Sequence, residues 1–441
     1  MMTGFLALLF AFSALARPAW AGEPVPKTLG FRQALQLARE RHVEVVLAEE
    51  RVQRAIERLS EAGSVLRPQL TATVSQSRQT RNLEAMGITI PGRDPLVGPF
   101  NTFDGRLRWN QPLFDAEALD RLKAARADRA LSEAESARAR EDALALAATL
   151  YLEARRAGQS VELARAVADW AQARLELAQA RLRSGSGTAV EEDQASAELE
   201  SARHRLRAAE AEAVERRLDL AVALGLDPET PPGFAEESPE ELSSESFREG
   251  GPNAALDSPD VRVARAHLER RSLERSVERS ARLPSLSASA DYGLSGTTPG
   301  RSLGTYSVGG QVSLPIYEGG RTSSRIDQAE GRLKESRIQL EDVESRSKAR
   351  FLSAEEELIR AGSRLEAGEA GLLAADKDLS VVEEKAEAGS AGALELIEAR
   401  ARRAAALDEL RAAQTGVRLA QVGMARALGR MGVWAGDGME P

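Results

Sequence analysis

Two long stretches without proline limit the folds open to this 441-residue chain more than any other feature. Residues 115–184 contain a single glycine, Gly158, and residues 321–388 also lack proline. Because proline ends or kinks helices, each stretch can form one continuous helix, which at 1.5 Å per residue is roughly 100 Å long. An aromatic content of 4% is low for compact cores. The sequence therefore predicts an elongated, helix-rich architecture.

Apolar residues recur at every seventh position in both stretches, which is typical of a coiled-coil seam. The recurring positions are Leu163, Trp170 and Leu177 in the first stretch, and Phe351, Leu358, Leu365, Leu372 and Leu379 in the second. Gly185 and Gly389 follow the two seams and mark turns into return helices, which end near Gly225 and Gly429. Each half of the chain is expected to contain one long antiparallel helical hairpin.

The chain is an internal duplication. The segment "LRPQLTATVSQSR" matches "RLPSLSASADYGL", and "GRLRWNQPLFDAEAL" matches "GGQVSLPIYEGGR". Gly185 and Gly389 lie 204 positions apart, as do Gly225 and Gly429. A repeat of this length is the size of a domain. We expect two structural repeats with pseudo-twofold symmetry, residues 22–225 and 258–430, with an acidic connector at 226–257 and a tail at 431–441.

Four segments alternate apolar with polar residues and are predicted to be strands, at about 69–78, 103–112, 285–294 and 304–314. In the third, one face carries Leu286, Ala288, Ala290, Tyr292 and Leu294. Strands of this length with one apolar and one polar face are typical of a membrane barrel with lipid outside and water inside. The same periodicity also fits a sheet half-buried in a soluble domain.

Four strands cannot close a membrane barrel alone. About eight is the smallest closed size, and an open edge in lipid leaves backbone groups unpaired, so other copies must supply the missing strands. Prolines at strand ends beside helices are tolerated, because a missing N–H costs little there. We therefore expect strand–helix junctions at Pro68, Pro112, Pro284 and Pro315, and exterior loops at 79–102 and 295–304.

The first residues predict a cleaved signal peptide, residues 1–21. An apolar run starts at Phe5 and is followed by Ala19, Trp20 and Ala21, the small-x-small pattern of a cleavage site. No Lys or Arg precedes the run, so a membrane anchor is the alternative.

Charge and residue types exclude several functions. The formal net charge of -9 offers no basic footprint for nucleic acid. With no cysteine in the chain, disulfides, thiolate metal sites and a Cys nucleophile are excluded. His42, His204 and His267 are scattered over charged helices, and we interpret all three as surface residues. No catalytic residue, cofactor or metal site is expected, so the chain is predicted not to be an enzyme.

With these motifs the chain resembles the outer-membrane factor, or TolC-like, family of trimeric channel-tunnels over nearly all of its length after residue 21. The resemblance is carried by "LRPQLTATVS", "WNQPLFD", "ARLRSGSGTAVEED", "VALGLDP", "RLPSLSASADYG", "LPIYEGGR" and "EAGSAGALELIEA". Two departures occur. The Asn-Pro pair that is usual in the first helix of the family is replaced by Arg41, His42 and Val43. After Gly185, the glycine of the first hairpin turn, the usual Asp-Val-Leu is replaced by Glu-Glu-Asp.

The resemblance implies a mixed α and transmembrane β fold. Four strands per chain would contribute to a shared twelve-stranded barrel in the outer membrane of a Gram-negative bacterium, continued by a helical barrel in the periplasm. It implies a homotrimer in contact with outer-membrane lipid, a periplasmic adaptor and an inner-membrane transporter. The function implied is passive exit of substrates in tripartite efflux or type I secretion. The alternative is a coiled-coil scaffold of the cell envelope that forms no channel.

The same resemblance implies two sets of site residues. The hairpin tips that contact the adaptor in the family correspond to Gly185, Gly187, Gly389 and Ser390. The carboxylates that narrow the tunnel in the family correspond to Glu191, Glu395 and Glu398. Residues three apart share a helix face, so Glu395 and Glu398 would concentrate negative potential around a threefold pore and favour cations. Without the resemblance, these carboxylates equally fit a solvated helix face.

Overall fold

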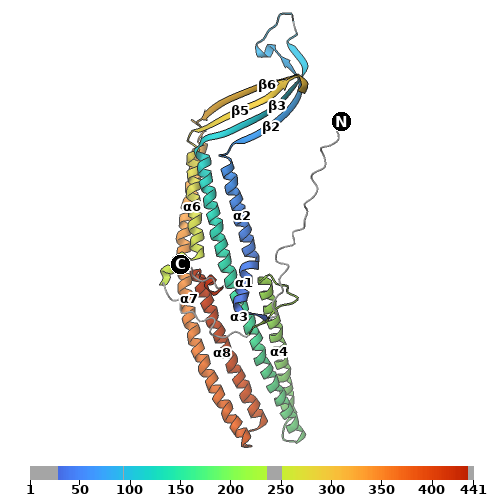
Figure 1. The fold of residues 1–441 in the computed structure, drawn as a ribbon. Helices are drawn as coiled ribbons and strands as arrows, with labels where there is room; N and C mark the ends of the chain where they lie inside the picture. Colours follow the sequence, from blue (N-terminus) through green and yellow to red (C-terminus); the bar gives the residue numbers. More distant parts are fainter. Residues whose placement is uncertain (1–27, 93, 236–250, 436–441) are drawn as a thin grey trace. The chain divides into compact units, whose positions relative to one another are not determined.

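The computed structural model describes residues 28–92, 94–235 and 251–435 (Figure 1). The predicted signal peptide, residues 236–250 of the connector and residues 436–441 of the tail lie outside this range. The chain divides into two units, each assembled from both sequence halves. The sheet unit comprises Leu47–Arg138 and Asn253–Ala349, and the hairpin unit comprises Met1–Val46, Ala139–Pro252 and Arg350–Pro441.

The sheet unit contains one four-stranded antiparallel sheet in the order β2-β3-β5-β6. Its strands are β2 (Gln69–Asn82), β3 (Leu96–Asp115), β5 (Ser285–Gly296) and β6 (Ser302–Ser313). The two sequence halves meet where β3 pairs with β5. This arrangement leaves β2 and β6 as the outer strands of the sheet.

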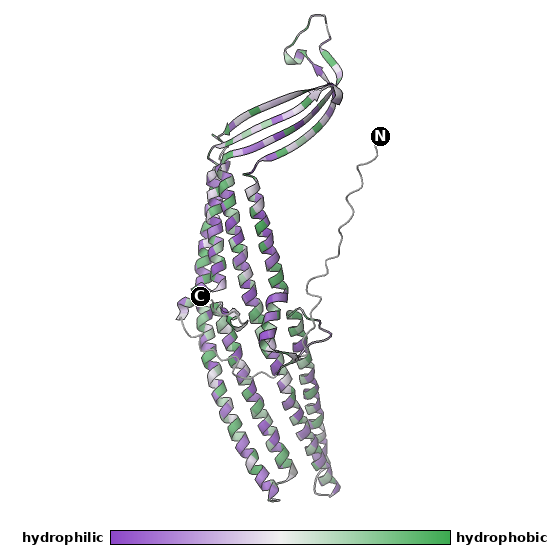
Figure 2. Cartoon of the chain, in the orientation of Figure 1, coloured by the Kyte–Doolittle hydropathy of each residue, from purple (hydrophilic) through white to green (hydrophobic). Residues whose placement is uncertain are grey.

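The strand register brings the apolar residues of all four strands onto one face. Leu70 lies opposite Trp109, and Leu107 lies opposite Tyr292, which in turn lies opposite Tyr306. Several side chains on this face are exposed, including Leu70 at 66% and Val308 at 76%, whereas Trp109 and Leu286 are partly buried. In Figure 2, hydrophobic and hydrophilic residues alternate along the strands. The sheet therefore presents an apolar surface that is largely open to solvent.

Polar side chains pair with one another on the opposite face. Arg106 of β3 donates to Asp291 of β5 and, at 3.3 Å, to Asp104. Its guanidinium also lies 3.4 Å from the hydroxyl of Thr305 on β6. The polar face is thus cross-linked from strand to strand.

The strands extend further than the alternation alone predicts, and Pro112 lies inside one of them. β2 and β3 continue into the expected loop and leave residues 83–95 between them, including a 3-10 turn at Glu84–Met86. β3 runs through Pro112 to Asp115, so this proline does not end the strand as expected. A register shift against β5 between Pro112 and Phe114 accommodates the missing N–H. Pro68 and Pro284 directly precede β2 and β5, and Pro315 follows β6.

Four helices connect to this sheet. α2 (Val43–Ser64) and α6 (Pro259–Ser280) lead into β2 and β5, while α3 (Ala116–Arg183) and α7 (Arg321–Glu387) follow β3 and β6. Gly319 and Gly320, with φ of 61° and 86°, form the turn into α7, a conformation that other residues rarely adopt. Among the described residues, none of the helices combines the length and apolarity needed to cross a membrane.

The hairpin unit contains two helical hairpins. α3 turns into α4 (Ala189–Ala223), and α7 turns into α8 (Ala393–Leu428). The core between α3 and α4 is built from small residues: Ala168, Ala171 and Ala202 are buried together with Leu199. Small side chains let the two helices approach closely, which explains why so few aromatic residues are needed.

A small core in the hairpin unit joins the segment that begins at Thr28 to the connector after α4. β1 (Thr28–Leu29) pairs in parallel with β4 (Gly233–Phe234). The fully buried Tyr151 of α3 packs edge-on against Phe31 and Phe234, with ring centroids 5.5 and 5.3 Å away. Its hydroxyl donates to the carbonyl of Leu29 at 3.2 Å.

Replacing Tyr151 with Phe should loosen this core. The Leu29 carbonyl would lose one of its two donors and keep the Ala235 amide at 3.1 Å, at a cost of roughly 0.5–1.5 kcal/mol. We expect faster hydrogen exchange of the Ala235 amide, measured by mass spectrometry. Tyr317→Phe, at a residue that is 87% exposed, is the control and should change nothing. Equal exchange in the Tyr151 variant and the native chain would contradict this role of the hydroxyl.

Candidate functional site

The two hairpin tips have the same turn geometry. In the first, the Gly185 amide donates to the backbone carbonyl of Leu182 at 3.0 Å, and the Ser186 amide donates to the backbone carbonyl of Arg181 at 2.9 Å. In the second, the Gly389 amide donates to Ala386 at 3.0 Å and the Ser390 amide donates to Lys385 at 2.8 Å. This is a Schellman motif, in which glycine supplies the left-handed residue, and φ is 75° at Gly185 and 71° at Gly389.

Gly187 is required by a close approach within the first tip. A Cβ there would lie 2.9 Å from the Cβ of Arg181 and 3.1 Å from the amide nitrogen of Leu182. These contacts are shorter than a carbon atom tolerates, so a larger residue would force the turn to change. The four residues predicted to contact an adaptor lie in the turns at the ends of the two hairpins, where Gly185, Gly389 and Ser390 are exposed and Gly187 is partly buried.

Glu191 has a local structural contact. Its amide donates to Thr188 Oγ1, and its carboxylate accepts from the Thr188 amide, both at 3.3 Å. This reciprocal pair is a capping box that satisfies two backbone donors at the start of α4. A carboxylate in the first turn is also favoured by the helix dipole. The capping box therefore gives Glu191 a structural role that does not depend on a pore.

Glu395 and Glu398 lie one turn apart on α8, on the other hairpin from Glu191. Both side chains are exposed, and Glu395 is in the first turn of the helix. Glu398 lies 3.5 Å from Arg402, which also donates to Asp378 of α7 at 2.9 Å. The guanidinium of Arg402 therefore partly offsets the negative potential around Glu398.

Ion pairs between the helices of each hairpin were missed by the sequence analysis. Arg174 of α3 donates to Glu198 of α4 at 2.5 Å, and its guanidinium lies 5.5 Å from the centre of the Trp170 ring. Arg403 of α8 donates to Asp376 of α7 at 2.5 Å. The only sequence signal for these residues is their position beside the heptad seam, because a chain rich in Glu and Arg offers many alternative pairs.

α3 has a second antiparallel neighbour in the hairpin unit, α8. Arg156 of α3 donates through both terminal nitrogens to the two carboxylate oxygens of Asp408, each at 2.7 Å. Both side chains are mostly buried, and this two-pronged geometry is the strongest form of an arginine–carboxylate pair. With the α3–α4 and α7–α8 pairs, this contact gives the helix order α4, α3, α8, α7 (Figure 1).

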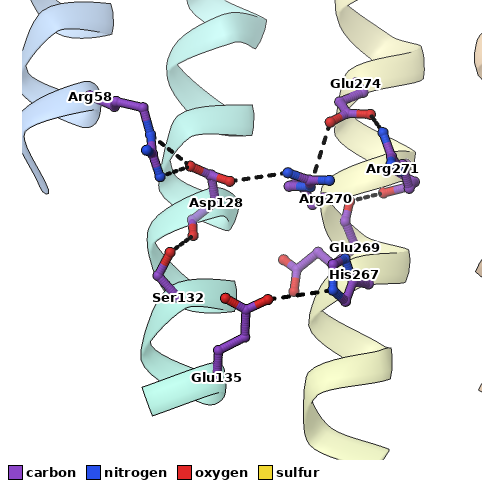
Figure 3. Close-up of polar contacts among 10 residues, drawn as sticks. Arg58, Asp128, Ser132, Glu135, His267, Glu269, Arg270, Arg271 and Glu274 are labelled. Atoms are coloured by element: carbon purple, nitrogen blue, oxygen red, sulfur yellow. Dashed lines mark hydrogen bonds and ion pairs between the residues drawn. The ribbon is translucent and has the colours of Figure 1, made fainter. Parts of the chain in front are cut away.

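In the sheet unit, one carboxylate joins three helices (Figure 3). Asp128 of α3 accepts from Arg58 of α2 at 2.8 Å and from Arg270 of α6 at 3.2 Å. Asp128 thereby links α2 and α6 through α3. The cluster of Arg58, Asp128 and Arg270 therefore connects the three helices.

His267 lies beside this cluster at the surface, where 40% of its side chain is exposed. Its Nε2 is 3.6 Å from a carboxylate oxygen of Glu135 (Figure 3). Burial lowers the pKa of His267, and the nearby Arg270 lowers it further. The imidazole is therefore neutral at neutral pH, and its contact with Glu135 is not an ion pair there.

Comparison with known proteins gives consistent results for family and fold. The profile of the family described as "Outer membrane efflux protein" matches residues 34–226 and 251–430. The outer membrane efflux protein BepC of Brucella suis is 29% identical over 154 residues, and the matched stretch spans 34% of each chain.

Solved outer membrane proteins, among them the channels CmeC and MtrE, share the fold at low sequence identity. CmeC of Campylobacter jejuni superimposes with a TM-score of 0.78 at 17% identity, covering 94% of this chain and 90% of its own. VceC of Vibrio cholerae gives 0.72 at 18% identity, covering 90% and 96%. MtrE of Neisseria gonorrhoeae gives 0.70 at 20% identity, covering 90% and 88%. The predicted channel-tunnel fold is thereby confirmed, and because the family profile matches both halves of the sequence, the chain belongs to the outer membrane efflux protein family.

Proposed function

We propose that three copies of this chain form a passive exit duct for substrates that an inner-membrane transporter delivers through a periplasmic adaptor. Members of the family are outer-membrane channels that extend into the periplasm, and they work as trimers with adaptors and transporters. The relatives are transport proteins and not enzymes, and the proposal assigns no hydrolysis and no cofactor to this chain. The transporter would supply the energy.

The observation that carries the proposal is the four-stranded sheet with an exposed apolar face. β2 and β6 are its outer strands, and each offers a row of unpaired N–H and C=O groups. In lipid these groups must be paired, so β6 of one copy would pair with β2 of the next until a barrel of twelve strands closes. The apolar face would then contact lipid, and the face that carries Arg106 would line the water-filled interior.

The adaptor would dock at the hairpin tips, at Gly185, Gly187, Gly389 and Ser390. These turns are exposed, and glycine presents bare backbone that a partner can approach closely. Glu395 and Glu398, with Glu191, would line the narrow end of the tunnel.

The mass of the protein extracted from separated outer membranes in mild detergent tests the proposal. Light scattering, with the detergent contribution subtracted, should give three chains per particle. A monomer or dimer recovered from the soluble periplasm would instead favour an envelope scaffold that forms no channel.

A charge on the apolar face should block assembly in the membrane. Val308→Lys places an ammonium group among lipid chains, at a cost of roughly 2–4 kcal/mol near the bilayer centre. We expect less trimer in outer membranes, measured by quantitative immunoblotting of separated membranes. Ser307→Lys, on the adjacent residue of β6 that points to the polar face, is the matched control. Equal trimer levels in both variants would contradict the assignment of the two faces.

Removing the two carboxylates of α8 should change conduction. Glu395→Ala with Glu398→Ala lowers the negative potential at the proposed constriction, so we expect weaker cation preference and larger single-channel currents in planar bilayers. Because Arg402 lies beside Glu398, Glu395→Ala alone should have the larger effect of the two single changes. Glu409→Ala, at an exposed position further along α8, is the control. Currents unchanged in the double variant would overturn the constriction.

A further inference from the structure

Two arginines lie two residues apart on the polar face of β3, and their surroundings differ. Arg106 donates to Asp291 and to Asp104, so two carboxylates surround its guanidinium, and its side chain is 24% exposed. Arg108 is exposed, and the described part of the chain gives it no hydrogen bond and no ion pair. The charge of Arg108 is therefore open to water.

The two carboxylates near Arg108 are bound to Arg106 instead. The strand register puts Asp291 directly opposite Arg108, but the Asp291 carboxylate accepts from Arg106 and its side chain is only 20% exposed. Asp104 is 37% exposed and lies four residues from Arg108, roughly 13 Å along β3. The polar face thus carries excess negative charge at the level of Asp104 and positive charge at the level of Arg108.

The strand on the other side of Arg108 brings no carboxylate to it. Thr71 of β2 is the residue opposite Arg108 there, and neither β2 nor β6 contains Asp or Glu. In the proposed trimer, β6 of the next copy lies beside β2. Whatever the register of that pair, the positive potential of Arg108 extends over two strands without being offset.

We infer that three copies of Arg108 form a ring that attracts anionic solutes into the barrel. The inference rests on the proposed duct, because the polar face lines water only if the barrel closes. Rings of arginine favour anions in pores, and low-dielectric walls focus the potential of such rings. A guanidinium can bind a carboxylate, sulfate or phosphate group through two parallel hydrogen bonds, so these groups define the class of solute.

A single reporter cysteine can measure the potential at this ring, because the native chain contains no cysteine. In the variant T71C the thiol lies beside Arg108, at the roughly 5 Å between opposite residues of paired strands. Trimers in lipid nanodiscs, which leave both ends open to water, are treated with one of two methanethiosulfonates, carrying a sulfonate or a trimethylammonium group. The ratio of the two rates reports the local potential, since changes in thiol reactivity cancel.

Removing the charge with R108Q in the T71C background should lower the ratio of sulfonate to ammonium rates by roughly two- to tenfold, as expected for one unit charge at this distance. R108E should lower the ratio further, and R108K should keep the value of T71C alone. R78Q is the matched control, because Arg78 is an exposed arginine of the same strand as Thr71 but lies on the opposite face. It should leave the ratio unchanged.

Equal ratios in T71C and T71C/R108Q would overturn the ring and leave the duct intact. The duct is checked separately with L70C, at the neighbouring residue on the apolar face. Lipid should protect that cysteine from both charged reagents, although Leu70 is 66% exposed in the single chain. Reaction of L70C as fast as T71C, or particles with fewer than three chains by light scattering, would overturn the duct and the ring with it.

Discussion

The pairing of backbone hydrogen bonds at the sheet edges is the constraint on which the rest of the structure depends. The sheet order makes β2 and β6 the outer strands, and lipid offers no water to their free N–H and C=O groups. A chain with four strands can satisfy them only by association. The duplication serves this end, because β3 and β5, from different halves, pair at the middle of the sheet and leave one free edge to each half.

The alternation of apolar and polar residues predicted the two faces of the sheet well, because successive side chains of a strand point to opposite faces whichever strand lies beside it. The proline-free stretches likewise predicted α3 and α7. The path through Pro112 was less predictable, since the sequence does not show that a register shift can accommodate the proline inside a long strand. The two-residue strands β1 and β4 are too short for any period to be visible.

The candidate site was predicted by resemblance more than by chemistry. The tip glycines could be located from their spacing, and their left-handed backbone agrees with the turns expected there. The capping role of Glu191 and the partner of Glu398 depend on side-chain directions that spacing does not give. The ion pairs between helices were hidden for a related reason: charged residues are so frequent in this chain that composition gives no preference among partners.

The first hairpin combines two kinds of contact that respond differently to salt. Ala168, Ala171 and Ala202 let α3 and α4 approach closely, and Leu199 packs among them with Trp170 and Leu206 against this core. The Arg174–Glu198 pair also joins the two helices and is partly exposed to solvent. Dissolved salt screens such contacts over about 8 Å at physiological ionic strength. A rise in ionic strength therefore weakens the ion pair between α3 and α4, whereas the apolar contact between the same helices does not depend on this screening.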